Sequence, residues 1–291
     1  TTGGLPVVAA LAGMSERAGI AAIAWLAIAV GAPTIAVLLA RVPEPEPTAA
    51  GRGMARVDLL AILRNRPFLR LFCAWFLNGL ATGLPAVLFP LYLQHGLEAG
   101  QTARGVMIFA YFAAGCGAIP LWLGLSRRFG KHRVWCGAML LAMAAFVWVP
   151  LLRPGDDAAF LVICLITGAA LGADVALPPA MQADVVDLDL LRTGEARAGL
   201  YFAIWGMGTK LAFGTAAGAG FFALARAGFH TSGGNGAGAL FALAAAYALA
   251  PVVLKGCAVA LVWNYPLTVR RHAIIRRRLE RRGLSPGRSP A

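Results

Sequence analysis

Charged side chains are scarce in this sequence. Asp, Glu, Lys and Arg make up only 13% of its 291 residues, whereas 59% are apolar. Soluble domains contain about 25% charged and about 45–50% apolar residues, so this composition excludes an ordinary soluble enzyme. A transmembrane helix needs about 20 mainly apolar residues. The long apolar runs of the chain therefore predict an all-helical, polytopic membrane protein.

Residues that build catalytic or metal centres are also few. The chain has 5 Cys and 4 His. The cysteines lie in apolar runs without C-x-x-C spacing and are expected to be small buried hydrophobic residues. The histidines are far apart in the sequence, which argues against a metal site. Since no nucleophile triad, phosphate-binding glycine loop or zinc motif is present, we expect no enzymatic activity, no metal and no cofactor.

Seven apolar segments are predicted to cross the membrane. They lie at residues 20–40, 68–93, 105–125, 134–152, 159–181, 200–225 and 238–264. A run of alternating Pro and Glu separates the first from the other six and favours an extended linker. The expected organisation is an N-terminal segment with one helix (1–40), a central linker (41–67), a six-helix bundle (68–264) and a basic tail (265–291).

Lys and Arg residues are distributed unequally between the connections. Of the 26, 20 lie in the linker region, in the turn at 126–133, between the fifth and sixth helices, or in the tail. The positive-inside rule therefore predicts a cell-membrane protein whose N-terminus is outside and whose tail is cytoplasmic. This distribution explains the net charge of +13 without a nucleic-acid partner. The expected partner of the tail arginines is the anionic surface of the lipid bilayer.

Three ionisable residues lie within the predicted helices, near the membrane midplane. They are Lys210, Asp174 and Lys255. Such residues are costly in hydrocarbon, usually face the bundle interior and mark functional sites. Pro178 and Pro179 remove amide donors just after Asp174, which predicts a broken helix there. A broken helix beside an acid near the midplane is typical of a substrate or ion site in transporters.

Two further polar residues are weaker candidates for this predicted site. Asn78 and Thr82 are one turn apart in the second helix, and interhelical hydrogen bonding explains them equally well. Asp174 and one lysine also fit a structural ion pair that holds helices together. Even with that pair formed, the three ionisable residues near the midplane keep one surplus positive charge. An anionic substrate, or carboxylates on absent helices, would balance it.

Residues 181–214, MQADVVDLDLLRTGEARAGLYFAIWGMGTKLAFG, resemble the glycoside–pentoside–hexuronide:cation symporters, the melibiose-permease-like branch of the major facilitator superfamily. The segments LLAILRNRPFLRLF at 59–72 and SRRFGKHR at 126–133 are similar to that family as well. The resemblance implies a major-facilitator-type helical bundle equivalent to helices six to twelve. It also implies that the missing N-terminal half of the same protein, which carries the cation-binding carboxylates, is a partner of this chain.

The implied function is cation-coupled symport, with H⁺ or Na⁺, of a small-molecule substrate by alternating access. The substrate is a sugar or glycoside, or another small and anionic solute, since the chain has Val175 where the family's sugar transporters place an aromatic residue. By match to the family, Lys210 senses substrate or ion. The aspartates of the family motif and the basic loop after it are expected to form a cytoplasmic gate of ion pairs. That gate comprises Asp184, Asp187, Arg192 and Arg197.

Two other functions fit parts of the pattern. Seven helices with an outside N-terminus and a lysine in the last helix are typical of a seven-helix receptor or photoreceptor, with Lys255 carrying retinal. No acid lies one turn before Lys255, however, and the 41–67 connection is long for such a bundle. A non-transporting membrane binding protein derived from a half-transporter is the other alternative.

Overall fold

The computed structural model of the chain describes residues 16–41, 62 and 64–282. Within these ranges the structure is helical, with no strand, which confirms the predicted all-helical class. Residues 1–15, most of the predicted linker (42–61 and 63) and the end of the predicted tail (283–291) lie outside the described residues.

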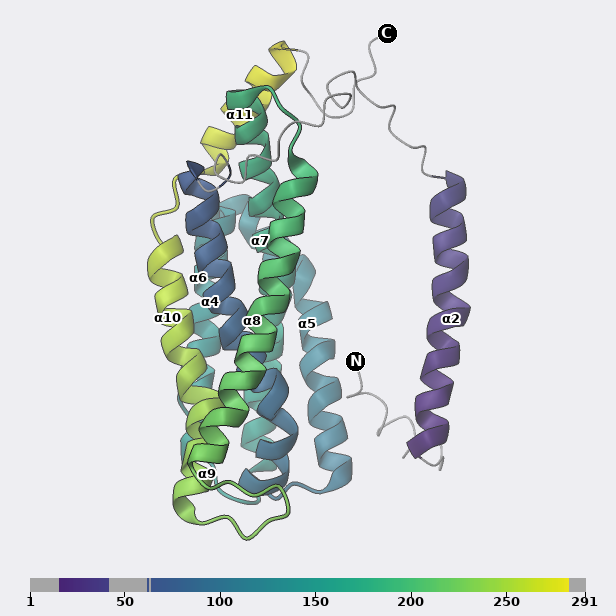
Figure 1. The fold of residues 1–291 in the computed structure, drawn as a ribbon, viewed down its shortest axis with the longest axis vertical. Helices are drawn as coiled ribbons and strands as arrows, with labels where there is room; N and C mark the ends of the chain where they lie inside the picture. Colours follow the sequence, from purple (N-terminus) through teal and green to yellow (C-terminus); the bar gives the residue numbers. More distant parts are fainter. Residues whose placement is uncertain (1–15, 42–61, 63, 283–291) are drawn as a thin grey trace.

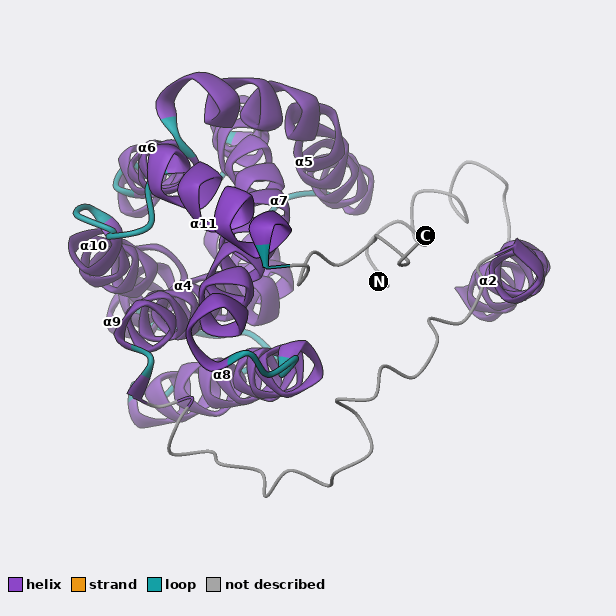
Figure 2. Cartoon of the chain, turned by 90° about the horizontal axis from the view of Figure 1, so that it is seen from above, coloured by secondary structure: helices purple, strands orange, loops and turns teal. Residues whose placement is uncertain are grey.

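Six helical columns run side by side and form one bundle (Figure 1). In chain order they are α4 (Arg66–Leu91) with the π-helical turn η2 (Tyr92–Gly96); α5 (Gln101–Phe129); α6 (Lys131–Phe146), followed by the short turn η3 (Val149–Leu151); α7 (Asp157–Thr193); α8 (Ala198–Arg226); and α9 (Ala237–Ala244), the π-helical turn η4 (Ala245–Leu249) and α10 (Ala250–Val262) as one column. A separate helix, α2 (Glu16–Arg41), lies apart from the bundle in both views (Figures 1 and 2). These helices match the predicted segments to within about one turn, with one exception.

The exception is α7, which continues through Pro178 and Pro179 to Thr193. The predicted break is therefore wrong. Proline is tolerated within membrane helices because neighbouring groups compensate for the missing donors. The helix ends instead at Gly194, whose left-handed conformation (φ 74°) is the usual glycine C-cap.

Five helical segments of the described chain are long and apolar enough to cross a membrane. They are Arg66–Gly96, Gln101–Phe129, Lys131–Leu151, Asp157–Thr193 and Ala237–Val262. The helix α8 has a comparable length of 29 residues and runs along the bundle beside them (Figure 1). It is less apolar because Lys210 and several glycines lie within it.

The outer surface of the bundle is apolar, as expected for a surface in contact with lipid. Large side chains such as Phe222 and Val253 are exposed there. Cys73, Cys116 and Cys257 are exposed as well, so the expectation that every cysteine is buried is wrong for these three. In a membrane the apolar side chains of a bundle face outward as readily as inward.

Glycines allow close contact between pairs of helices. A Cβ atom on Gly168 of α7 would overlap the carbonyl oxygen of Tyr111 in α5. One turn further along, a Cβ atom on Gly172 would lie 2.5 Å from the carbonyl oxygen of Gly115. Small residues at such contacts are the usual means of packing helices tightly in membranes. The spacing of α5 and α7 therefore depends on these glycines.

The two π-helical turns lie in α4–η2 and α9–η4–α10. They place Tyr92 and Tyr247 face to face, with ring centroids 4.7 Å apart and planes within 3° of each other. The Tyr92 hydroxyl also donates to the carbonyl of Val149 at 2.9 Å. These contacts join the two columns at the end of the bundle opposite α11.

The loops rich in Lys and Arg gather at one end of the bundle, which we call the basic end. Here α4, α6 and α8 begin and α5, α7 and α10 end. A further helix, α11 (Val269–Arg281), lies across it (Figure 2). Sequence alone predicted only a basic tail at this place. The helix α11 is amphipathic, and Ile275 and Leu279 pack against Leu188 of α7.

Candidate functional site

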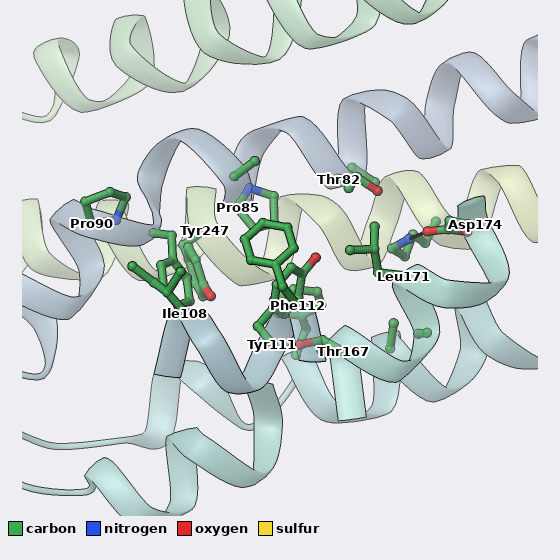
Figure 3. A pocket seen from close by; sticks show the side chains of 17 residues that line it. Thr82, Pro85, Pro90, Ile108, Tyr111, Phe112, Thr167, Leu171, Asp174 and Tyr247 are labelled. Atoms are coloured by element: carbon green, nitrogen blue, oxygen red, sulfur yellow. Dashed lines mark hydrogen bonds and ion pairs between the residues drawn. The ribbon is translucent and has the colours of Figure 1, made fainter. Parts of the chain in front are cut away.

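A partly open cavity of about 260 Å³ lies between α4, α5, α6, α7 and the α9–η4–α10 column (Figure 3). Its lining is mainly aliphatic and aromatic: Ala81, Thr82, Pro85, Ala86, Phe89, Pro90, Ile108, Tyr111, Phe112, Ala142, Phe146, Thr167, Ala170, Leu171, Asp174, Tyr247 and Lys255. The glycine contacts of α5 and α7 hold the wall that carries Tyr111 close to the wall that carries Leu171. The cavity is thus built by helices that are distant in sequence.

A buried ion pair forms part of the lining. The Lys255 ammonium lies 3.3 Å from the Asp174 carboxylate, and the two residues are only 4% and 6% exposed. Lys255 also donates to the side-chain oxygen of Asn78 at 2.6 Å, and the indole N–H of Trp135 donates to Asp174 at 2.7 Å. Burying two charges is costly unless hydrogen bonds satisfy them. Asn78 and Trp135 supply those bonds, so residues of α4, α6, α7 and α10 meet at this pair.

Thr82 has a different environment. It lies one turn after Asn78 on α4 and lines the cavity. Its hydroxyl is buried and has no hydrogen-bond partner within the described residues. The other threonine of the lining, Thr167, donates to the carbonyl of Ile163 at 2.7 Å. An unpaired hydroxyl in a largely apolar cavity is a place where a ligand gains a hydrogen bond.

The structure therefore brings together four of the five predicted substrate- or ion-binding residues: Asp174, Lys255, Asn78 and Thr82. Lys210 does not join them. It is exposed on α8, and a Cβ atom added to Gly206, Gly214 or Gly218 would also meet nothing within 4 Å. The expectation that Lys210 lies at the same membrane depth as the other two charges stays a prediction, but Lys210 does not line the cavity. The inferred surplus positive charge is accordingly not part of the cavity.

A second group of charges lies at the basic end. The Lys131 ammonium is 2.7 Å from Asp184. His272 of α11 is 2.9 Å from Asp187 and 3.4 Å from Asp184. Lys131, Asp184, Asp187 and His272 form what we call the basic-end cluster, which ties α6, α7 and α11 together.

The two aspartates of the predicted gate thus have partners other than those expected. Sequence reasoning assigned them to Arg192 and Arg197. In the structure Arg197 pairs with Glu195 of the same loop at 2.5 Å, and Arg192 lies beside α11. Lys131 was visible in the SRRFGKHR segment at 126–133, whereas His272 gave no signal as a single histidine in an arginine-rich tail. No group of three His, Cys, Asp or Glu residues suited to a metal ion occurs in the described part of the chain.

Sequence reasoning also missed residues of the cavity. Trp135 gave no sign that its indole would bind Asp174, because nothing in a sequence relates residues 39 positions apart. Tyr111 was not singled out in the sequence, although it lines the cavity together with Phe112 and Tyr247.

Comparisons with known proteins agree with this architecture. Residues 2–269 match the family described as "MFS/sugar transport protein". A protein of Synechocystis sp. (strain ATCC 27184 / PCC 6803 / Kazusa) that is described as an uncharacterised symporter is 26% identical over 139 residues. Those residues are 48% of this chain and 26% of that protein, so the chain spans about a quarter of the length of this relative. Because the family match extends over most of the sequence, the chain belongs to the MFS/sugar transport protein family of membrane transporters, as the melibiose-permease-like resemblance predicted.

Proposed function

We propose that the chain is the C-terminal half of a secondary active transporter that carries a small solute by alternating access, coupled to H⁺ or Na⁺. The observation that carries this proposal is that Asp174, Lys255 and Thr82 line one cavity and that Asn78 accepts a hydrogen bond from Lys255 there. Polar groups gathered between membrane helices are typical of transporter sites. Family membership disfavours an enzyme and the seven-helix receptor alternative.

The orientation that we propose follows from the basic end. Arg66, Arg128, Lys131 and Arg192 lie where helices begin or end there, and α11 adds further arginines. By the positive-inside rule this end faces the cytoplasm, and the N-terminus of the chain lies outside the cell membrane. The cavity then lies within the membrane, and the basic-end cluster lies at the cytoplasmic mouth.

In this proposal the two charge clusters have separate roles. The Asp174–Lys255 pair responds to the solute or to the coupling ion, because a proton or cation on Asp174 weakens its hold on Lys255. The basic-end cluster acts as the gate, and its ion pairs break when the cytoplasmic side opens. Arg192 and Arg197 flank that gate. Lys210, on the exposed face of α8, contacts the other half of the transporter or the coupling ion.

The test is uptake by the native gene product reconstituted in liposomes, with a range of small solutes under an imposed H⁺ or Na⁺ gradient. We expect gradient-driven uptake that Asp174→Asn and Lys255→Gln reduce by at least about tenfold, equivalent to about 1.4 kcal/mol. Cys116→Ala, on the exposed surface of α5, is the matched control. Gradient-driven uptake that is unchanged in both site variants would contradict the assignment of this cavity.

A further inference from the structure

We propose that the cavity selects a small, net-neutral solute with a mainly apolar, ring-sized body and one terminal hydrogen-bonding oxygen, in preference to a free sugar or an anion. This inference rests on the proposed function, since it names the substrate class of the same cavity. Three properties of the lining carry it: cancelled charge, apolar walls and one unsatisfied polar end.

The charges of the cavity cancel within the protein. Asp174 and Lys255 lie 3.3 Å apart, and each has a further hydrogen bond, from Trp135 and to Asn78 respectively. The surplus lysine that would favour an anion, Lys210, lies on the exposed face of α8. A carboxylate entering the cavity would bring an unbalanced charge into an apolar environment, where burial of a charge is heavily penalised. The arrangement therefore favours a neutral solute.

Most side chains of the walls offer a solute no hydrogen bond. Phe89, Phe112, Phe146 and Leu171 present only carbon atoms, and the wall hydroxyls besides Thr167 are those of Tyr111 and Tyr247. Thr167 has already donated its hydroxyl hydrogen to the carbonyl of Ile163. A free sugar brings a hydroxyl group on almost every carbon, and most of them would lose water without gaining a partner here. Aromatic side chains instead pack well against a flat or cyclic apolar body.

The polar end supplies what one oxygen atom needs. Thr82 has a buried, unpaired hydroxyl. Lys255 has three N–H donors and two acceptors within the described residues, Asn78 and Asp174. Thr82 and Asp174 lie toward the same end of the cavity in Figure 3, away from Pro90 and Ile108. A terminal carbonyl or hydroxyl oxygen can accept from both the hydroxyl and the ammonium.

The size of the cavity limits how large a body it can cover, although the cavity is partly open. Its volume of about 260 Å³ exceeds that of an apolar cavity of about 150 Å³ that binds benzene. It therefore has room for one six-membered ring with a short polar substituent. Benzamide is a suitable probe, and benzoate differs from it chiefly by its negative charge.

The experiment measures binding of benzamide, benzoate and glucose to the native gene product in lipid nanodiscs by saturation-transfer NMR, with empty nanodiscs as the blank. We expect benzamide to bind at least about tenfold more tightly than benzoate, and glucose to give no saturable signal. Thr82→Val, which keeps the shape and removes the hydroxyl, should weaken benzamide binding by about fivefold to tenfold. Thr215→Val on the exposed face of α8 should leave it unchanged.

The outcomes separate this inference from the proposed function. Tighter binding of benzoate or glucose than of benzamide would overturn the inference, even if uptake assays show a transporter. Equal benzamide binding by the wild type, Thr82→Val and Phe112→Ala would overturn it as well; Phe112, half exposed at the cavity, gives a second variant if Thr82→Val does not fold. The expected selectivity without gradient-driven transport would support the cavity chemistry and contradict the transport function.

Discussion

The two charge clusters on α7 differ most in their access to solvent. The Asp174 and Lys255 side chains are 8% and 5% exposed, and their further hydrogen bonds are with residues of two other helices, α4 and α6. In the basic-end cluster the Lys131 side chain is 30% exposed and that of Asp187 24%. The same residue types thus occur on one helix in a nearly closed environment and in one open to solvent.

This difference determines what each cluster can do. A buried pair cannot lose one partner without leaving an uncompensated charge, so it stays matched unless a ligand or ion replaces a partner. An exposed pair is worth little, because water and salt replace its interactions readily. The buried pair is therefore suited to recognition, and the basic-end cluster is suited to repeated opening and closing.

The largest expected effect separates the two clusters by deletion of one carboxylate in each. Asp174→Ala leaves the Lys255 ammonium buried without its counter-charge and should lower the free energy of unfolding by about 3–5 kcal/mol. Asp187→Ala should cost less than about 1 kcal/mol. Detergent-titrated unfolding in mixed micelles measures both. The double variant Asp174→Ala/Lys255→Met should recover much of the loss, and equal costs for the two single variants would remove the distinction.

The next effect concerns the hydrogen bond that Trp135 donates to the Asp174 carboxylate at 2.7 Å. Trp135→Phe should cost about 1.5–3 kcal/mol, because hydrogen bonds to charged groups are the stronger ones. Trp122 donates at the same distance to the neutral carbonyl of Ala169. Trp122→Phe makes the same change in size and should cost about 0.5–1.5 kcal/mol for its bond. A larger loss for Trp122→Phe in the same unfolding assay would show that the charge of Asp174 is not what matters.

A third test asks whether the cavity depends on helix spacing. Gly168→Ala places a methyl group against the carbonyl oxygen of Tyr111 and should destabilise the bundle by about 1–3 kcal/mol. It should also move Tyr111 and change ligand binding in the cavity. Gly117→Ala on α5, where an added Cβ meets nothing within 4 Å, should have no such effect. Unchanged stability and binding for Gly168→Ala would contradict the close packing of α5 and α7.

The smallest effect is expected at the basic end. His272→Gln keeps a hydrogen-bond donor for Asp187 but never carries a charge, and it should weaken the docking of α11 by less than about 1 kcal/mol. Because the cluster is partly exposed, high salt in a buffer acidic enough to protonate His272 should loosen α11 in the wild type more than in His272→Gln. Distances between spin labels on α11 and α5 at low and high salt provide the measurement. An identical salt response in both proteins would argue against an electrostatic contribution from His272.

Much of the fold could be predicted because apolar length alone determines where membrane helices lie. The helix α7 is longer than predicted because Pro178 and Pro179 were given the effect that they have in isolated helices, whereas proline is tolerated within membrane helices. The helix α11 was not predicted from the sequence because its apolar face is narrow. Ile275 and Leu279, four residues apart among arginines, were its only sign.

The site was predictable in residue type but not in arrangement. Ionisable residues in a membrane helix indicate a site, and Asp174 and Lys255 were found in this way. The same rule also selected Lys210, because a sequence does not say which face of a helix points inward. The rule did not select Trp135 and Tyr111, because aromatic residues are common in membrane helices. Their partners also come from elsewhere in the chain.

The π-helical turn η4 has a consequence for how sequences of this family are aligned. It accommodates one residue more than an α-helical turn, and one residue corresponds to a rotation of about 100°. A helical wheel drawn without interruption from α9 to α10 therefore misplaces Leu243 relative to Lys255 by about that angle. A relative with a one-residue gap at Ala245–Leu249 and a regular α-helical turn there would therefore keep the residues on either side of the gap on the same faces. Such a gap alone would not indicate an altered site, whereas an alignment without the gap would shift every position on one side of it by one residue.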